Sequence, residues 1–210
     1  NAELNLLRKF GHNIILFNKY NKYPNKTNFF TLALNTIWSW HVENELLSIL
    51  TTEKPDLVHF HNTFMNISPA AYYACAKVSV PVVQTLHNYR LLCPKATLSR
   101  KNTICEKCRN KKFLWPAIQY ACYRNSRLAT FTVSIMLAFH YLIKTWHTKV
   151  DVYIALTEFS RQKFIAGGLS AKKIVVKPNF VHFDSNYDEH NQAQVLFVGR
   201  LSPEKGIRTL

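Results

Sequence analysis

Leu57-Val-His-Phe-His61 and Pro81-Val-Val-Gln-Thr-Leu-His87 are two short runs rich in apolar and β-branched residues, which is typical of buried strands. The segment between them is too long for a hairpin. It contains Ser68-Pro69, a hydroxyl residue before a proline, which is a common start of a helix. The stretch therefore predicts a strand, a crossover helix and a second strand parallel to the first.

Similar runs recur on both sides of this unit, at residues 12–17, 151–156, 173–177 and 194–198. A second Ser-Pro pair, Ser202-Pro203, follows the last run. Repeated alternation of strand and helix patterns predicts an α/β fold with a parallel sheet that helices cover on both faces.

Composition narrows the classes of protein to consider. The chain has 210 residues, 48% of them hydrophobic and 19% charged, which excludes a disordered or fibrous protein. Lys and Arg number 27 against 12 Asp and Glu, a net charge of +15. That excess favours nucleic acid, phosphorylated metabolites or an anionic membrane as partners, although a solvated basic surface explains it equally well. Five cysteines, an odd number, favour a reducing, cytoplasmic location.

A polar stretch at residues 179–192 separates two strand-like runs and is interpreted as a linker. Residues 1–178 then form one domain, and residues 193–210 are the first strand and helix start of another. The chain begins with Asn1 and ends within a helix pattern at Leu210, so we expect a fragment of a longer protein.

The segment Val195-Leu-Phe-Val-Gly-Arg-Leu-Ser-Pro-Glu-Lys-Gly206 reads as a strand, a turn at Gly199 and a helix start that carries Arg200 and Lys205. Free backbone N–H groups and a positive helix dipole make such a junction suitable for a diphosphate. The alternative is an ordinary tight turn with exposed basic residues.

This segment resembles the retaining glycosyltransferases of group 1, family 4, which have the two-domain GT-B architecture. The resemblance extends over nearly the whole chain in the expected order. It includes the following segments: Leu156-Thr-Glu-Phe-Ser-Arg-Gln-Lys-Phe164, Lys173-Ile-Val-Val-Lys-Pro-Asn179, His59-Phe-His-Asn62, Ser68-Pro69 and Pro81-Val-Val-Gln-Thr-Leu-His-Asn-Tyr-Arg-Leu-Leu-Cys-Pro94. It implies that residues 1–178 are an acceptor-side Rossmann-like domain that lacks its first strand, and that residues 193–210 open the nucleotide-sugar domain.

The resemblance also implies roles for individual residues. Arg200 and Lys205, beside Gly199, bind the donor diphosphate, and no catalytic metal is needed for that. His87, at the end of its strand, hydrogen-bonds and orients the donor sugar; the alternative is a structural histidine.

On the acceptor side, His59 and His61 share one strand face because their spacing is two. His61 and Asn62 are the acceptor-side candidates, whereas His59 is interpreted as structural. Two histidines at this spacing also suit a metal, for which the resemblance gives no support.

Four cysteines form a further group in an insertion at residues 93–122: Cys93, Cys105, Cys108 and Cys122. The pair Cys105-Glu-Lys-Cys108 has the two-residue gap of a zinc knuckle, and the other two cysteines complete a tetrahedral set. The sequence leaves three alternatives open, which are a structural zinc, free thiols and disulfides.

Residues 128–146 predict a helix with a stripe formed by Leu128, Phe131, Ile135, Phe139 and Leu142. Core packing is the simpler interpretation of this stripe. The alternative is contact with an anionic membrane surface, which suits a lipid-linked acceptor.

The sequence thus predicts an enzyme that moves a sugar from a nucleoside diphosphate sugar to a glycan or lipid-linked acceptor. Cell-surface polysaccharide synthesis, in the cytoplasm or at the inner face of the cell membrane, is the expected setting. Two motifs of the family are not present, namely the glycine-rich loop after the first strand and the glutamate pair that holds the donor. We therefore expect the fragment alone to be inactive. The alternatives are a truncated non-catalytic product and a basic zinc-knuckle module for nucleic acid, a partner that we do not expect.

Overall fold

The structure is a computed structural model that describes residues 2–19, 28–101, 103–180 and 197–199. The chain divides into two compact units, residues 1–14 with 180–210 and residues 15–179. The first unit contains helix α1 (Ala2–Lys9). Arg200, Lys205, Ser202-Pro203 and most of the run at 194–198 lie outside the described residues. The second unit holds the sheet and the core.

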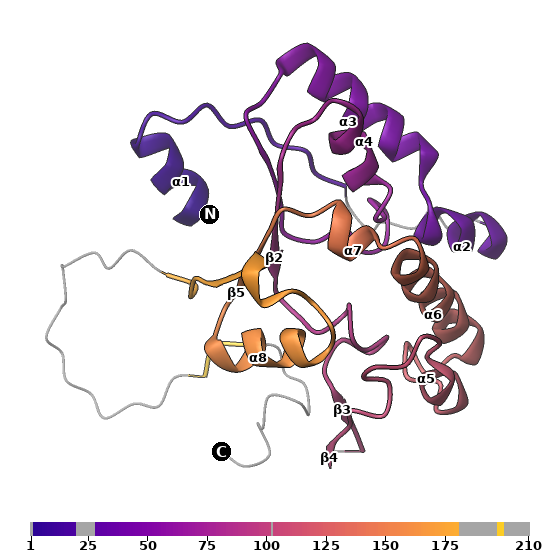
Figure 1. Cartoon of the computed structure of the whole chain (residues 1–210). Helices are drawn as coiled ribbons and strands as arrows, with labels where there is room; N and C mark the ends of the chain where they lie inside the picture. Colours follow the sequence, from indigo (N-terminus) through magenta and orange to yellow (C-terminus); the bar gives the residue numbers. More distant parts are fainter. Residues whose placement is uncertain (1, 20–27, 102, 181–196, 200–210) are drawn as a thin grey trace, which may run out of the picture. The chain divides into compact units, whose positions relative to one another are not determined.

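Four parallel strands form the sheet of the second unit (Figure 1). Their order across the sheet follows the chain: β1 (Val58–Phe60), β2 (Val82–Leu86), β5 (Val152–Ala155) and β6 (Ile174–Val176). The register pairs Val58 with Val82, and Val83 with Val152. Each strand coincides with one of the predicted runs, so the predicted α/β class with a parallel sheet is confirmed.

Two local predictions were wrong. Residues 12–17 are extended but make no strand, because a strand needs a ladder partner and Ile15 and Leu16 remain exposed instead. The helix expected at Ser68-Pro69 begins later, at Ala71, with Ala70 as its cap. Ser68 has a positive φ of 59°, and its hydroxyl accepts hydrogen bonds from the backbone of Ser39 and Ala70. It therefore ties the loop before the helix to the start of another helix.

Helices make the crossovers between the strands and cover the sheet (Figure 1). Helix α4 (Ala71–Lys77) joins β1 to β2, and α8 (Glu158–Ala166) with a short 3-10 turn (Ala171–Lys173) joins β5 to β6. The crossover from β2 to β5 is much longer. It contains the following elements: β3 (Ser99–Arg100), β4 (Thr103–Ile104), α5 (Trp115–Gln119), α6 (Arg127–Leu142) and α7 (Thr145–Thr148). The two remaining helices are α2 (Phe29–Ile37) and α3 (Trp40–Glu53).

Aromatic side chains hold the helices to the sheet. Tyr72 of α4 packs edge-on against Phe60 of β1, with ring centroids 5.0 Å apart, and its hydroxyl donates to Gln84 Oε1 of β2 at 2.7 Å. Phe164 of α8 is fully buried and stacks on Tyr89, which follows β2. The carboxyl ends of β1 and β2 are thus supported by packing from two crossover helices.

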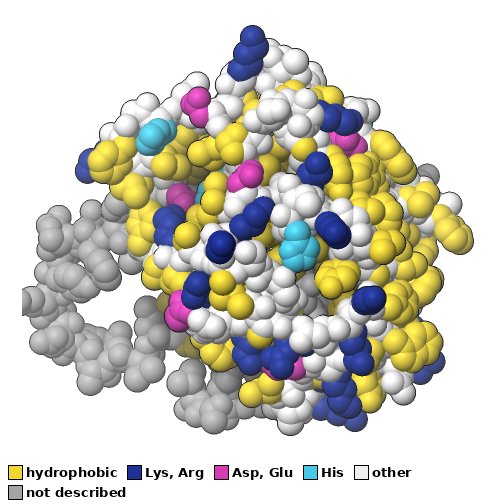
Figure 2. All heavy atoms as spheres, viewed as in Figure 1, with side chains coloured by type: hydrophobic (Ala, Val, Ile, Leu, Met, Phe, Trp, Pro, Cys, Tyr) yellow, Lys and Arg dark blue, Asp and Glu magenta, His cyan; other side chains and the backbone are white. Residues whose placement is uncertain are grey.

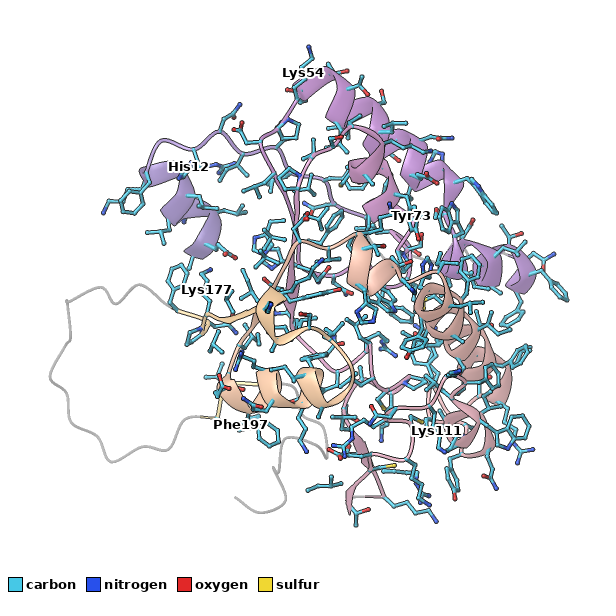
Figure 3. All side chains as sticks on the ribbon, in the orientation of Figure 1. His12, Lys54, Tyr73, Lys111, Lys177 and Phe197 are labelled. Carbon is cyan, nitrogen blue, oxygen red and sulfur yellow. The ribbon has the colours of Figure 1, made fainter. Side chains whose placement is uncertain are left out.

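A fully buried histidine joins three helices. His140 of α6 lies 2.8 Å from the carbonyl oxygen of Ile37 through Nε2 and 2.9 Å from Thr145 Oγ1 through Nδ1. Because a carbonyl only accepts, Nε2 carries the proton and Nδ1 accepts from the Thr145 hydroxyl. Tyr73, on α4 in Figure 3, completes the chain with its hydroxyl 2.9 Å from Thr145 Oγ1. Burial lowers the pKa of His140 to about 4.

Helix α6 buries the face opposite to the predicted one. Its buried residues are Thr130, Thr132, Val133, Ser134, Met136, Leu137 and His140, whereas Leu128, Phe131, Phe139 and Leu142 are exposed. The core-packing interpretation of the stripe is therefore wrong. Thr130 and Thr132 are tolerated on the buried face because they donate to backbone carbonyls one turn earlier. Figure 2 shows hydrophobic side chains gathered over α2 and α6, with Lys and Arg among them.

Candidate active site

The two neighbouring strands β1 and β2 end in the same dipeptide, His61-Asn62 and His87-Asn88. Each asparagine side chain accepts a hydrogen bond from the backbone N–H two residues further on, at 3.0 Å in both cases. The asparagines therefore turn the chain sharply after each strand, and they leave the histidines at the edge of the sheet. Ligands of open parallel sheets bind at this edge.

The two imidazoles meet directly. His61 Nδ1 lies 3.0 Å from His87 Nε2, and their rings are stacked at an interplanar angle of 24°. Both side chains are exposed. His59 lies behind them, half-buried, with its ring 4.3 Å from that of His61 and its Nε2 2.7 Å from Thr85 Oγ1. The predicted sharing of one strand face by His59 and His61 is confirmed.

The short contact between His61 Nδ1 and His87 Nε2 limits which of the two nitrogens can carry a proton. One nitrogen donates and the other accepts, so a proton on both facing nitrogens would set two N–H groups against each other. The pair thus presents both hydrogen-bond donors and acceptors at this edge of the sheet. The side-chain oxygen of Asn62 already accepts a hydrogen bond within the turn, so mainly its amide nitrogen is left to bind a ligand.

Arg90 is a residue of this region that the sequence reasoning missed. Its guanidinium lies 4.2 Å from the ring of Phe64 and 5.1 Å from that of Tyr123, and Nη1 donates to the carbonyl oxygen of Pro94. Burial lowers the pKa of Arg90. Because Phe64 follows β1 and Arg90 follows β2, the contact holds together the loops after the two histidines. Its position three residues after His87 was the one sequence signal that could have placed it near the site.

The donor-side candidates belong to the other unit. Of these candidates the structure describes Gly199, at the end of the short segment 197–199. A Cβ atom added at Gly199 would lie 3.2 Å from the Phe197 ring. Arg200 and Lys205 lie outside the described residues. The predicted diphosphate site thus remains a prediction.

The four cysteines of the insertion come together. Cys93, Cys105, Cys108 and Cys122 line one small pocket with the side chains of Lys95, Arg100 and Lys107. All are free thiols, and burial raises the pKa of the Cys108 thiol to about 12. The fifth cysteine, Cys75, is buried separately in α4. Lys111, an exposed residue of the insertion, is labelled in Figure 3.

Glu106, between Cys105 and Cys108, ties the insertion to the rest of the second unit. Its carboxylate accepts a hydrogen bond from Lys163 Nζ of α8 at 2.5 Å and lies 2.5 Å from Arg109 Nη1. The hydrogen bond from Lys163, with the charge of Arg109, lowers the pKa of Glu106. The carboxylate is thus ionised where it anchors the loop.

A parallel α/β sheet with polar side chains at the carboxyl ends of adjacent strands defines a Rossmann-like ligand-binding domain. The model of glycosyltransferase family 4 matches residues 5–185, most of the chain. The chain belongs to this family, which is of the GT-B type, and the predicted family is confirmed.

One solved structure is similar, that of UDP-N-acetylglucosamine 2-epimerase from Rickettsia bellii. The identity is 18% and the TM-score is 0.38, over 84% of this chain and 34% of the epimerase. The chain thus spans about a third of the length of that protein. A comparison with curated proteins gave no match.

Proposed function

We propose that the chain is part of a retaining glycosyltransferase that moves a sugar from a nucleoside diphosphate sugar to a glycan or lipid-linked acceptor in cell-surface polysaccharide synthesis. The observation that carries the proposal is the 3.0 Å contact between His61 and His87, at the ligand-binding edge of the sheet in a family 4 glycosyltransferase. Residues 15–179 are then the acceptor side of the enzyme.

Each histidine has a separate part in this proposal. His87 donates a hydrogen bond to the donor sugar as positive charge develops at the anomeric carbon and the leaving diphosphate gains negative charge. His61, together with the amide nitrogen of Asn62, contacts acceptor hydroxyls and fixes the orientation of the His87 ring through the shared hydrogen bond. Gly199 lets the backbone approach the leaving diphosphate, and Arg200 and Lys205 neutralise its charge, so that no catalytic metal takes part.

The assay uses the full-length product of the gene with a panel of nucleoside diphosphate sugars and membrane lipid extracts or glycans as acceptors. We expect release of nucleoside diphosphate that depends on the acceptor and persists in EDTA. NMR of the product should show the anomeric configuration of the donor. An inverted product contradicts retention, and loss of activity in EDTA contradicts the metal-free mechanism. Release that never depends on an acceptor contradicts transfer itself.

We assign the exposed apolar residues of α2 and α6 to an anionic membrane surface that presents the acceptor. Phe30, Leu34, Leu128, Phe131 and Leu142 are all exposed, α2 packs against α6, and Figure 2 shows hydrophobic side chains gathered over these two helices. Within the described residues no helix is long and apolar enough to span a bilayer. The enzyme then acts at the inner face of the cell membrane by lying on it.

Vesicle flotation tests this contact. Phe30→Asp should weaken binding to phosphatidylglycerol vesicles about tenfold, since burying one large apolar side chain contributes roughly 1.5–3 kcal/mol. Phe159→Asp on α8 is the matched control, because Phe30 and Phe159 are 74% and 66% exposed. Equal losses in the two variants, or equal binding to uncharged vesicles, would contradict a specific membrane face.

A further inference from the structure

Three separate segments bring four cysteine side chains to one pocket. Cys93 ends a turn after β2, where its N–H donates to Tyr89 O at 2.9 Å. Cys105 follows β4, with its N–H 2.8 Å from Leu98 O, and Cys108 lies one turn further on. Cys122 follows α5, with its N–H 3.0 Å from Ala117 O. The convergence is therefore a property of the fold and not only of the Cys-x-x-Cys spacing.

The insertion has little else to hold it together. Its only strands in the described residues, β3 and β4, have two residues each. A hairpin of this size is not stable by itself in water. Apart from the cysteines, the buried apolar side chains of the insertion, among the described residues, are few: Pro94, Ala96, Leu98, Leu114, Ala117 and Ile118. Small loop-rich units of this kind usually depend on a disulfide or a metal, and here all four cysteines are free.

The charges around the pocket favour a metal over a disulfide. Lys95, Arg100 and Lys107 line the same pocket as the four cysteines, and no carboxylate is found in its lining among the described residues. The guanidinium carbon of Arg100 lies 3.9 Å from the centre of the Tyr120 ring. The Nε atom of Arg100 is buried and has no hydrogen-bond partner among the described residues. Neutral thiols or disulfides bring no negative charge to these cations, of which Arg100 is half-buried and the two lysines are exposed. Four thiolates around one divalent ion carry a net charge of −2, which the three cations offset.

We propose that Cys93, Cys105, Cys108 and Cys122 bind one zinc ion that organises the insertion. Four protein ligands leave no open coordination position, so the site is structural and takes no part in sugar transfer. Among the described residues no three of these sulfur atoms lie within 4.8 Å of one another. Zn–S bonds of about 2.3 Å place sulfurs roughly 3.8 Å apart, so zinc draws the three segments closer together.

The test is the metal content of the whole chain, expressed with zinc in the medium and purified under reducing conditions without chelators. Plasma mass spectrometry should find about one zinc per chain, and Cys105→Ser or Cys108→Ser should reduce it to roughly a tenth or less. Cys75→Ser is the matched control and should keep its zinc, because Cys75 is buried in α4 outside the pocket.

A second measurement does not depend on whether the variants fold. Replacement of zinc by Co²⁺ in the wild-type chain should give the thiolate-to-cobalt absorption and strong visible bands of a tetrahedral sulfur site. Wild-type protein that takes up neither metal, a cobalt spectrum of octahedral type, or disulfides between these cysteines in freshly isolated protein would each overturn the proposal. Equal zinc loss in Cys75→Ser would do so as well.

Discussion

Alanine at His87 is expected to lower kcat for sugar transfer about 100-fold, because a preorganised donor aimed at charge that develops in the transition state contributes roughly that much. The loss should fall mainly on kcat rather than on KM for the donor, since the hydrogen bond strengthens as the glycosidic bond breaks. His87 is exposed and lies after the strand. The unfolding midpoint of the variant should therefore match that of the wild type.

Two further variants separate the proposed role from a general effect of losing a histidine. His87→Gln keeps a hydrogen-bond donor and should recover part of the lost kcat, whereas His41→Ala should change nothing. His41 lies on α3 with a side chain that is 85% exposed, so its removal controls for the substitution. A His87→Ala enzyme that keeps more than half of the wild-type kcat excludes the assigned role, whatever the overall activity of the protein.

The stability of the second unit should fall by about 3 kcal/mol between pH 6.5 and pH 4 because of His140. Burial lowers the pKa of His140 from 6.5 to about 4 in the folded state. Above pH 6.5 the side chain is neutral in both states, so it contributes no pH dependence. Between the two values the unfolded chain binds a proton that the folded chain does not, and folding is therefore disfavoured. Below about pH 4 both states are protonated and the loss is complete.

Urea unfolding of the wild type and of His140→Gln over this pH range measures the effect. Glutamine keeps a donor for the Ile37 carbonyl but does not titrate, so the difference in stability between the two proteins should shrink steadily from pH 6.5 to pH 4. Carboxyl groups titrate equally in both proteins and cancel in the difference. His41→Gln, on the surface, should follow the wild type. If the free energies of unfolding of wild type and His140→Gln change in parallel with pH, protonation of His140 does not destabilise the fold and the prediction is wrong.

The strands that the sequence predicted correctly are those whose partners are also apolar runs. Leu57 to His61 and Pro81 to His87 became β1 and β2 because each finds a neighbour in the sheet. Residues 12–17 are also mostly apolar, but strand formation depends on a ladder partner, which the run itself does not contain. Helix α6 was misjudged because it is apolar on two faces. Its buried face contains threonine and histidine that pair internally, and no hydropathy pattern shows such pairing.

The candidate site was predicted residue by residue but not as a contact. His61 and His87 were both identified, yet their 3.0 Å approach depends on the register of β1 against β2. That register pairs residues 24 positions apart and so brings the two histidines, 26 positions apart, to the same edge of the sheet. Arg90 was missed because a single arginine in a loop carries no pattern, and its position against Phe64 follows from packing. The cysteine spacing indicated a group with lysines near it in sequence, whereas the positions of Lys95 and Arg100 at the same pocket became visible only in three dimensions.

The crossover from β2 to β5 is the part of the domain whose length can change with the least effect on the sheet. Parallel strands need a crossover whatever its length, so residues can be gained or lost there without shifting the pairing of β2 with β5. The insertion is tied to α8 by the ion pair of Glu106 and Lys163. A crossover of another length would leave the pairing of β1, β2 and β5 unchanged, and with it the strands that carry the two histidines. The fold separates a constant scaffold from a replaceable module, an arrangement that suits both natural diversification and loop grafting.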